Sequence, residues 1–402
     1  MSAIRIASRI TRIKTSPSST AADRANALRR EGKSIVNLVT GEPDFDTPEV
    51  IRRAACAAIE QGETRYTQNN GTPILRQAIA DKFMRENHLS FTANNIIVTC
   101  GAKSAIFNAL AATLEPGDKV LIPAPYWVSY PDMVMACDGQ PVIIPCQQEH
   151  GFKLTAEQLR AAITPECRWL LLNSPSNPSG ASYSDQELRA LADVLMEHPT
   201  LAIMTDDIYE HIRFDRSTPN HLLAIEPGLA DRTLVVNGVS KTYAMTGWRI
   251  GYAAGPEALI TAMGTLQSQS TSNACSVSQA AAVAALNSGT DFIEQSRETY
   301  RQRRDQMVDA INSIPGLTCQ PPDGAFYLYV NCAGMIGRQT PQGIRLNNDN
   351  DVVLYLLESE GVAVVPGAAY GISPYFRLSI ATDIDTLLEG ANRMARALAQ
   401  LC

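Results

Sequence analysis

The sequence predicts an α/β protein whose larger domain is built on a mostly parallel sheet of seven strands. Two patterns support this fold class. Short apolar runs alternate with helix-length amphipathic segments through the middle of the chain, and most of these runs are apolar at nearly every position. Parallel strands are covered by helices on both faces, so they are apolar throughout instead of alternating with polar residues. The same fold predicts that ligands bind beyond the carboxyl ends of the strands.

The seven predicted strands are short, and several are bounded by glycine, proline or asparagine. They cover residues 95–99, 119–123, 141–145, 168–173, 201–205, 233–237 and 250–254. Segments such as 104–114 and 186–197 lie between them and have the length and polarity of covering helices. We therefore assign residues 46–290 to a large domain that contains this sheet.

A second, smaller domain follows, and its pattern is that of an α+β unit. A long amphipathic helix is predicted from residue 291 to 314, where Pro315 and Gly316 end it. Three short strands are predicted after it at 326–330, 362–365 and 376–380, with two further helices at 349–360 and 383–398. We assign residues 291–402 to this domain, and residues 1–45 to an N-terminal arm that forms part of it.

The composition excludes several classes of function. The chain has 402 residues, 45% of them hydrophobic, and a net charge of -7 with scattered basic residues, which disfavours nucleic acid or an anionic membrane as a partner. No apolar run reaches the roughly 18 residues of a membrane span, and the N-terminus lacks the apolar core of a secretory signal. The nine cysteines show neither a C-x-x-C pair nor metal-ligand spacing. We therefore expect reduced thiols, no bound metal and a cytoplasmic location.

The strongest chemical signal is Lys241, which follows directly on the predicted strand 233–237. Ser240 precedes it, and Arg249 follows eight residues later. An amine can act as a nucleophile, while a hydroxyl and a guanidinium together can bind a phosphate. Most lysines in loops are surface residues, and lysine chemistry alone favours that interpretation. The whole segment 240–252, Ser-Lys-Thr-Tyr-Ala-Met-Thr-Gly-Trp-Arg-Ile-Gly-Tyr, favours a functional lysine instead.

This segment resembles the lysine-site signature of the class I aminotransferases, and the resemblance extends in the family's order from Gly41 to Arg377. It implies the pyridoxal 5′-phosphate (PLP) fold type I and PLP as the cofactor. By this resemblance, Lys241 forms a Schiff base with PLP and then transfers a proton as acid and base. Ser240 and Arg249 are implied to bind the PLP phosphate.

A second phosphate-binding element is predicted at the turn 101–104, Gly-Ala-Lys-Ser, which follows the strand 95–99 and opens a helix. The free N–H groups and the positive dipole end of a helix N-terminus suit an anion. Such a turn is a weak signal by itself. The family has a phosphate site at this position, which implies that Ala102 and Lys103 contribute N–H groups.

Three polar residues near strand ends are implied to contact the PLP ring. A carboxylate beside the pyridine nitrogen keeps the ring protonated and electron-withdrawing. Asp206 and Asp207 compete for this position, and because consecutive residues of an extended segment point in opposite directions, only one can face the ring. The family's spacing to Tyr209 selects Asp206. Tyr209 and Asn177 are implied to hydrogen-bond the phenolic oxygen O3′, and Asn177 also binds the substrate's α-carboxylate.

Four further residues match family positions around the cofactor and the substrate. Trp127 offers a flat ring that can stack on the pyridine and border the substrate. Arg377 matches the arginine that binds the α-carboxylate through two parallel hydrogen bonds, and the backbone of Gly41 is implied to approach the same group. An ordinary core tryptophan and a solvent-facing arginine are the structural alternatives. Tyr66 matches a tyrosine that reaches the PLP phosphate of the neighbouring subunit, which implies a homodimer with shared active sites.

Within the family, the resemblance is to the bacterial aspartate aminotransferases, including those that also use prephenate. It rests on the run 126–131, Tyr-Trp-Val-Ser-Tyr-Pro, and on Lys103, which in this branch pairs with the distal carboxylate of a dicarboxylic substrate. Lys14 begins a Lys-Thr-Ser segment similar to one linked to prephenate use, but Pro17 and Ser18 depart from the usual Lys-Pro-Ser. We therefore predict amino transfer from aspartate to 2-oxoglutarate and leave prephenate use open.

Other reactions on the same scaffold remain as alternatives. An alanine or aromatic aminotransferase, a β-lyase and an aminopropane-carboxylate-type synthase differ in substrate contacts and would all share Lys241. A non-catalytic PLP-binding effector module of a transcription factor is an alternative of another class. It would need a helix-turn-helix domain, which we do not expect because the stretch before Gly41 is short and the chain is acidic.

Overall fold

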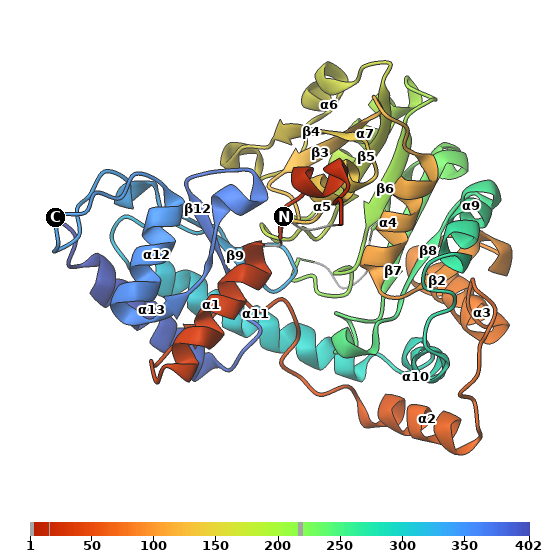
Figure 1. Cartoon of the computed structure of the whole chain (residues 1–402), viewed down its shortest axis with the longest axis horizontal. Coiled ribbons are helices and arrows are strands. Elements are labelled where there is room, and N and C mark those ends of the chain that lie inside the picture. Colours follow the sequence, from red (N-terminus) through yellow and green to blue (C-terminus); the bar gives the residue numbers. More distant parts are fainter. Residues whose placement is uncertain (1–3, 16, 216–219) are drawn as a thin grey trace.

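The larger part of the molecule is centred on a seven-stranded sheet (Figure 1). The computed structural model describes residues 4–15, 17–215 and 220–402. The strand order is β2-β8-β7-β6-β5-β3-β4. The strands are β2 (Ile96–Thr99), β3 (Lys119–Ala124), β4 (Gln140–Pro145), β5 (Cys167–Asn173), β6 (Ala202–Asp206), β7 (Thr233–Gly238) and β8 (Gly251–Ala254). Only β8 runs opposite to its neighbours, so the sheet is mostly parallel, which confirms the predicted fold class.

Helices cover both faces of this sheet. One face is covered by α4 (Ala102–Thr113), α5 (Tyr130–Ala136) and α9 (Glu257–Ser268). The other is covered by α3 (Pro73–Lys82), α6 (Ala156–Ala162), α7 (Asp185–Met196), α8 (Leu222–Ile225) and α10 (Ser276–Leu286), with α2 (Glu49–Glu60) against α10. Within β2, Ile97 packs on the first face and its neighbours Ile96 and Val98 on the second. Burial on both faces explains why the strands are continuous apolar runs.

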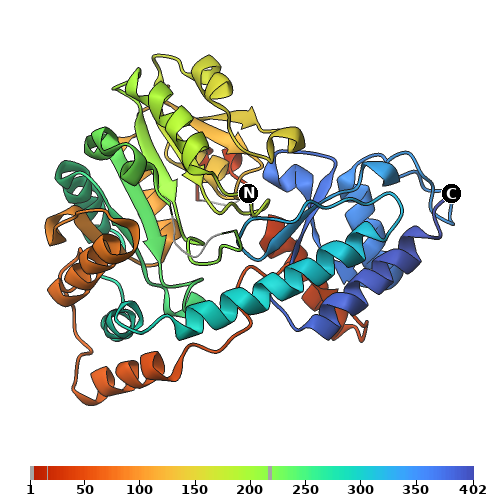
Figure 2. The ribbon, with the colours of Figure 1, turned by 180° about the vertical axis from the view of Figure 1, so that it is seen from behind.

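The smaller part contains two short sheets. One is antiparallel, with the order β11 (Val365–Pro366), β12 (Tyr375–Ser379) and β9 (Tyr327–Asn331), and the other pairs β1 (Val36–Asn37) with β10 (Val362–Ala363). The helices of this part are α1 (Pro17–Arg30), α12 (Asp349–Glu360) and α13 (Ile384–Leu398). The 22-residue helix α11 (Asp291–Asn312) runs from the large sheet to this part (Figure 2). The domain limits at residues 45 and 290 stay predictions.

The single strand predicted at 362–365 is wrong in one respect, because the structure divides it. Val362 and Ala363 pair with the N-terminal β1, whereas Val365 and Pro366 pair with β12 in the other sheet. A continuous apolar run does not reveal that its two halves have different partners. Among the described residues, no helix is both long enough and apolar enough to cross a membrane.

Candidate active site

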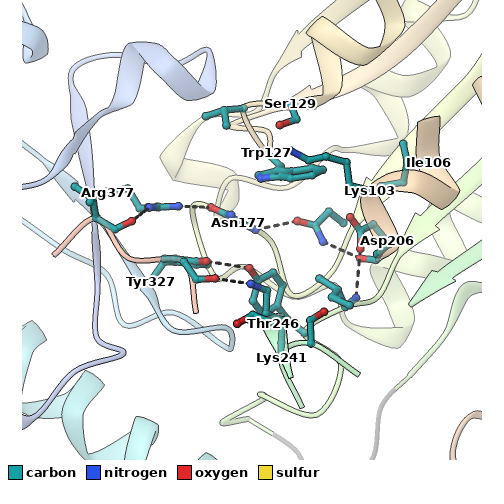
Figure 3. Close-up of a pocket in the computed structure, with 18 of the residues that line it drawn as sticks. Lys103, Ile106, Trp127, Ser129, Asn177, Asp206, Lys241, Thr246, Tyr327 and Arg377 are labelled. Carbon is teal, nitrogen blue, oxygen red and sulfur yellow. Dashed lines mark hydrogen bonds between the residues drawn. The ribbon is translucent and has the colours of Figure 1, made fainter. Parts of the chain in front are cut away.

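A cavity of about 270 Å³ lies between the two parts of the molecule, beyond the carboxyl ends of β5, β6 and β7 (Figure 3). A parallel sheet is expected to bind its ligand at this edge. Most of the predicted site residues line the cavity: Gly41, Ala102, Lys103, Trp127, Asn177, Asp206, Tyr209, Ser240, Lys241, Arg249 and Arg377. Residues predicted from motifs far apart in the sequence therefore meet in one place.

The lining of the cavity is strongly positive. Its charged side chains are the cations Lys103, Lys241, Arg249 and Arg377 and the carboxylate Asp206. Like charges that are held together in a partly buried space repel one another unless anions balance them. The cavity therefore suits ligands with several negative charges.

Lys241 lies in the turn after β7 and points into the cavity, where its Nζ donates a hydrogen bond to the carbonyl of Gly41 (Figure 3). Burial lowers the pKa of Lys241 to about 8, although Glu42 acts in the opposite direction. The positive charges of Arg377 and Arg249 contribute to this lowering of the pKa. A much larger share of this amine is therefore neutral near pH 7 to 8 than in an exposed lysine, and the neutral amine is the nucleophilic form.

Asp206 is the acid that faces the cavity. It is the last residue of β6, and burial raises its pKa to about 6 although Tyr130 Oη donates a hydrogen bond of 2.7 Å to its Oδ2. A cation beside such a buried carboxylate is stabilised and stabilises it in turn. Asp207 instead accepts a hydrogen bond of 3.0 Å from Thr205 Oγ1 and lies 3.0 Å from His221 Nε2. Its side chain is thus held by other partners.

The N-terminus of α4 and the guanidinium of Arg249 together form a cradle for an anion. Gly101 has a φ of 85°, and a Cβ at this position would collide with the Arg249 guanidinium. A Cβ at Gly251 would collide with the amide nitrogen of Ala102. The two glycines thus let the guanidinium approach the free amides of the helix, with the hydroxyl of Ser240 also lining the cavity. This donor set fits a phosphate.

Arg377 approaches from β12 on the opposite side of the cavity and is only 2% exposed. Its Nη1 donates to Asn177 Oδ1 at 3.1 Å, and its Nη2 donates to the Val39 carbonyl at 2.7 Å. Its buried Nε has no hydrogen-bond partner among the described residues. The ring of Tyr327 lies under the guanidinium, 4.4 Å from centroid to carbon. This guanidinium is oriented and still has a donor for a carboxylate.

Trp127 lies on the side of the cavity opposite Lys241 (Figure 3). Its ring meets that of Tyr130 edge to face, with 5.3 Å between centroids. Lys103 Nζ lies 4.7 Å from the Trp127 centroid. Burial lowers the pKa of Lys103, and the charge of Arg249 lowers it further. The indole is thus held firmly enough to cover a planar ring, and the ammonium of Lys103 lies over one of its faces.

Sequence reasoning missed Tyr327 and Asn173. The Tyr327 hydroxyl lies 2.9 Å from that of Tyr209, and Asn173 Nδ2 donates to the Asp206 carbonyl at 2.7 Å. Asn173 ends β5, so the rule that ligands bind beyond strand ends could have identified it. Tyr327 lies in an aromatic strand segment that reads as core and gives no local signal. The other lining residues that were missed are Val39, Ile106, Val128, Ser129, Ile208 and Thr246.

Two predicted residues do not line this cavity. Tyr66 is 92% exposed and lies in a surface hollow with Asn273 and Ser276. Lys14 is also exposed, and its backbone N–H donates to Asp132 Oδ1 at 2.9 Å. A single chain thus brings neither side chain to the site.

One cavity thus holds a buried amine of lowered pKa, a donor set that fits a phosphate and a buried carboxylate. Together with the fold, these groups define a PLP-dependent enzyme of fold type I. The comparison with known families agrees. The family of class I and II aminotransferases matches residues 33–394, and the chain belongs to this family. It is therefore a PLP-dependent aminotransferase.

The chain is similar to several known proteins over nearly its whole length. It is 53% identical to an aspartate aminotransferase of Rhizobium meliloti, over 99% of this chain and 97% of the relative. It is 51% identical to an aspartate/prephenate aminotransferase of Cereibacter sphaeroides, over 96% of each chain. The crystal structure of the aspartate aminotransferase from Rhizobium meliloti superposes with a TM-score of 0.97, covering 99% of this chain and 100% of that one at 52% identity. The aspartate aminotransferase from Thermus thermophilus with maleate has a TM-score of 0.91 at 40% identity, over 98% and 100% of the two chains.

Proposed function

We propose that this enzyme transfers the amino group of aspartate to 2-oxoglutarate, with Lys241 as the residue that moves the proton. The observation that supports this substrate class is the placement of two cations. Arg377 and Lys103 lie on opposite sides of the cavity into which Lys241 points (Figure 3). Aspartate and 2-oxoglutarate both carry two carboxylates. The relatives named aspartate aminotransferase support the same choice.

PLP, when bound, supplies an aldehyde for the amino group and a ring that withdraws electron density. We assign the retention of its phosphate to Ser240, Arg249 and the amides of Ala102 and Lys103. Asp206 holds a proton on the ring nitrogen, because a buried carboxylate is most stable beside a positive charge. These residues hold the cofactor and leave the Lys241 side of the cavity free for the reaction.

The remaining residues orient the reacting groups. Tyr209 and Asn177 donate hydrogen bonds to the phenolic oxygen O3′, and Trp127 covers the ring. Arg377 binds the α-carboxylate, which the backbone of Gly41 approaches. This leaves the substrate's Cα–H directed at the amine of Lys241. An amine with a pKa of about 8 can accept the Cα proton near neutral pH and donate it again, as the 1,3-proton shift of transamination requires.

A substrate panel on the purified enzyme tests the proposal. With aspartate and 2-oxoglutarate, we expect glutamate and oxaloacetate in equal amounts. Release of pyruvate and ammonia would instead indicate a β-lyase, and turnover of only alanine or aromatic amino acids would assign another aminotransferase activity. Prephenate belongs in the same panel as an amino acceptor. Because the Lys-Thr-Ser segment is similar to one linked to prephenate use, we propose that Lys14 helps to bind prephenate. Lys14→Ala should then lower the rate with prephenate and leave the rate with 2-oxoglutarate unchanged.

Lys103→Met should lower kcat/KM for aspartate by roughly 10- to 100-fold, because a charged hydrogen bond to the distal carboxylate is worth about 1.5–3 kcal/mol. The backbone amide stays in the phosphate cradle, so activity with alanine should change little. Steady-state kinetics with both donors measure this difference. Lys119→Met is the matched control, because Lys119 pairs with Glu166 at the far end of β3 at 3.2 Å. An equal loss with aspartate and alanine would contradict the assignment.

We further propose that the enzyme is a homodimer in which Tyr66 binds the PLP phosphate of the partner subunit. Tyr66 is almost fully exposed and does not line its own cavity, as expected of a residue that acts in another subunit. Exposed apolar side chains occur in the neighbouring elements, among them Ile59 of α2 and Ile74 of α3. An interface there would remove this apolar surface from water.

A hybrid dimer tests both parts of that proposal. Tyr66→Ala and Lys241→Ala subunits with different tags are co-expressed, and the mixed dimer is isolated on both tags. If Tyr66 acts across the interface, one of the two sites has both native residues. The hybrid should then show about half the wild-type activity at a PLP concentration that leaves the Tyr66→Ala homodimer unsaturated. Activity of only about half that of the Tyr66→Ala homodimer would show that Tyr66 acts within its own subunit, because the hybrid would then have a single site with Lys241, and that site would lack Tyr66.

A cytoplasmic location is proposed from the cysteines. All nine are free thiols, and five of them are buried: Cys137, Cys146, Cys167, Cys319 and Cys332. Free thiols are the state expected in a reducing compartment.

A further inference from the structure

Directly behind the active-site loops lies a buried ion pair that the mechanism above does not use. Lys82 at the end of α3 is 1% exposed, and its Nζ contacts Glu210 Oε1. Glu210 also accepts hydrogen bonds from Asn237 Nδ2 at 2.6 Å and from Asn87 Nδ2 at 2.7 Å. Lys82 in turn donates to Asn87 Oδ1 at 2.8 Å. We call these four residues the anchor cluster.

The anchor cluster joins three segments that are far apart in the sequence. A π-helical turn, Phe83–Asn87, follows α3 and brings Asn87 to the same side as Lys82, five residues earlier. Regular α-helical geometry would direct these two side chains apart, and π-helical turns are frequent at functional sites. Glu210 comes from the loop after β6, and Asn237 from the end of β7. A charged, fully hydrogen-bonded centre thus connects α3 to both catalytic loops.

Each loop places one residue in the anchor cluster and another, at most four residues away, in the cavity. Tyr209 lines the cavity, and the next residue, Glu210, is bound in the anchor cluster. Asn237 lies four residues before Lys241. A second connection runs through His211, whose Nδ1 lies 3.2 Å from the hydroxyl of Thr242, the residue after Lys241. The backbone segments that present Tyr209 and Lys241 are therefore fixed from behind by the same group of side chains.

The energetics argue against a purely structural role for the pair. Removing two charges from water costs about as much as their attraction returns, so apolar residues of similar size often stabilise a core equally well or better. A buried ion pair with every partner satisfied does, however, impose direction and distance, which apolar packing does not. A cation could also be imagined between Glu86, Glu210 and His211, whose ligand atoms lie within 4.8 Å of one another, but the ammonium of Lys82 already contacts Glu210.

We propose that Lys82 and Glu210 are positioning residues, which act through their backbone segments to hold Tyr209 and Lys241 in register with each other. The proposal rests on the function proposed above for Tyr209 and Lys241, and it concerns neither the substrate nor the cofactor directly. Placement errors of about an ångström can cost about 100-fold in rate. The ion pair thus serves the accuracy of the site more than the stability of the fold.

Two variants distinguish an effect on the placement of Tyr209 and Lys241 from an effect on the stability of the fold. Glu210→Gln alone leaves the buried Lys82 ammonium with only the more distant carboxylate of Glu86, at 3.7 Å, as a counter-charge, and the melting temperature should fall. Adding Lys82→Met removes both charges of the pair, while Glu86 keeps its contact of 2.9 Å with His211 Nε2, so the melting temperature should return to near the wild-type value. The kcat of this double variant should nonetheless stay about 10-fold or more below that of the wild type. A merely structural pair would regain activity together with stability.

A second readout needs neither substrate nor cofactor. Labelling of Lys241 in the apoenzyme with trinitrobenzenesulfonate, followed against pH, reports the pKa of the amine, about 8 in the native protein. The charged neighbours Glu42, Asp206, Arg249 and Arg377 are unchanged in the double variant. When the loop is loosened, water reaches the amine and stabilises its charged form. The midpoint of the labelling curve should therefore rise by about one pH unit toward that of an exposed lysine.

The control variant Arg168→Met with Asp118→Asn removes an ion pair of 2.8 Å at the opposite end of the sheet, and it should keep the wild-type kcat and midpoint. A double variant Lys82→Met/Glu210→Gln with restored melting temperature, wild-type kcat and an unchanged midpoint would overturn the proposal. If the wild type formed no glutamate from aspartate, the substrate assignment would fail, but the labelling midpoint would still test the anchor cluster.

Discussion

Replacing Lys241 with alanine should lower kcat by at least about 10⁴-fold. A positioned acid–base group contributes up to about 10⁴-fold by itself, and in the proposed function this amine also supplies the covalent attachment of the cofactor. The cavity offers no second amine in an equivalent place, since among the described lining residues Lys103 lies beside Trp127, across from Lys241 (Figure 3). Steady-state kinetics at saturating aspartate and 2-oxoglutarate measure the loss.

Chemical trapping gives this prediction an independent measurement. Borohydride treatment of the native enzyme should fix the cofactor to the peptide that contains Lys241, as identified by mass spectrometry. Because burial lowers the pKa of this amine to about 8, its capture of the cofactor by the apoenzyme should accelerate as the pH rises from 6 to 8 and then level off. Lys119→Ala is a control that should trap normally. Label on another lysine would contradict the assignment of Lys241.

The second large effect is expected at Arg377. Truncation to methionine should lower kcat/KM for aspartate by roughly 30-fold to several thousand-fold, because loss of one partner from a buried, hydrogen-bonded charge pair costs about 2–5 kcal/mol. Most of this loss should appear with every amino acid substrate, since all of them carry an α-carboxylate. This pattern distinguishes Arg377 from Lys103, whose loss should affect only dicarboxylic substrates.

Arg377→Lys separates charge from geometry. Lysine keeps the positive charge but cannot form the two parallel hydrogen bonds of a guanidinium or retain the contacts with Asn177 and Val39 together. We expect it to remain at least about 10-fold below the wild type. Arg301→Lys is the control, because Arg301 lies on the exposed face of α11 and pairs with Glu298 of the same helix. Wild-type kinetics in Arg377→Lys would mean that no bidentate carboxylate contact is made there.

Much of the fold could be predicted because its information is local. The strands of the large sheet differ from their predicted bounds by at most one residue at each end, and α12 agrees at both. Buried parallel strands are short apolar runs with clear boundaries, and helices have their own periodicity. The error at 362–365 arose where local apolar character was the same on both sides of Val364 but the pairing partners differed. Pairing is a long-range property that an apolar run does not encode by itself.

The site could be predicted to a similar extent, for a related reason. Asp206 and Lys241 follow strands and lie in recognisable motifs, and in a parallel sheet the carboxyl ends of neighbouring strands must lie at one edge. Tyr327 and the anchor residue Lys82 had no such signal. Tyr327 looks like a core aromatic residue, and a lysine near the end of an amphipathic helix is usually exposed, whereas Lys82 is buried against Glu210. The role of a residue that acts through a partner far away in the sequence cannot be recognised until the tertiary structure shows the two in contact.

The chain by itself therefore determined the fold class, because periodicity is a property of neighbouring residues. Its motifs also predicted, through the resemblance of segment 240–252 to a family signature, that Lys241 is the reactive amine. Only the tertiary structure decided which side chains meet. It brought Arg377 to Asn177, 200 residues away, and Lys82 to Glu210, 128 residues away. It also decided how burial changes the pKa of Lys241 and of Asp206, since the cost of charging a group depends on everything packed around it.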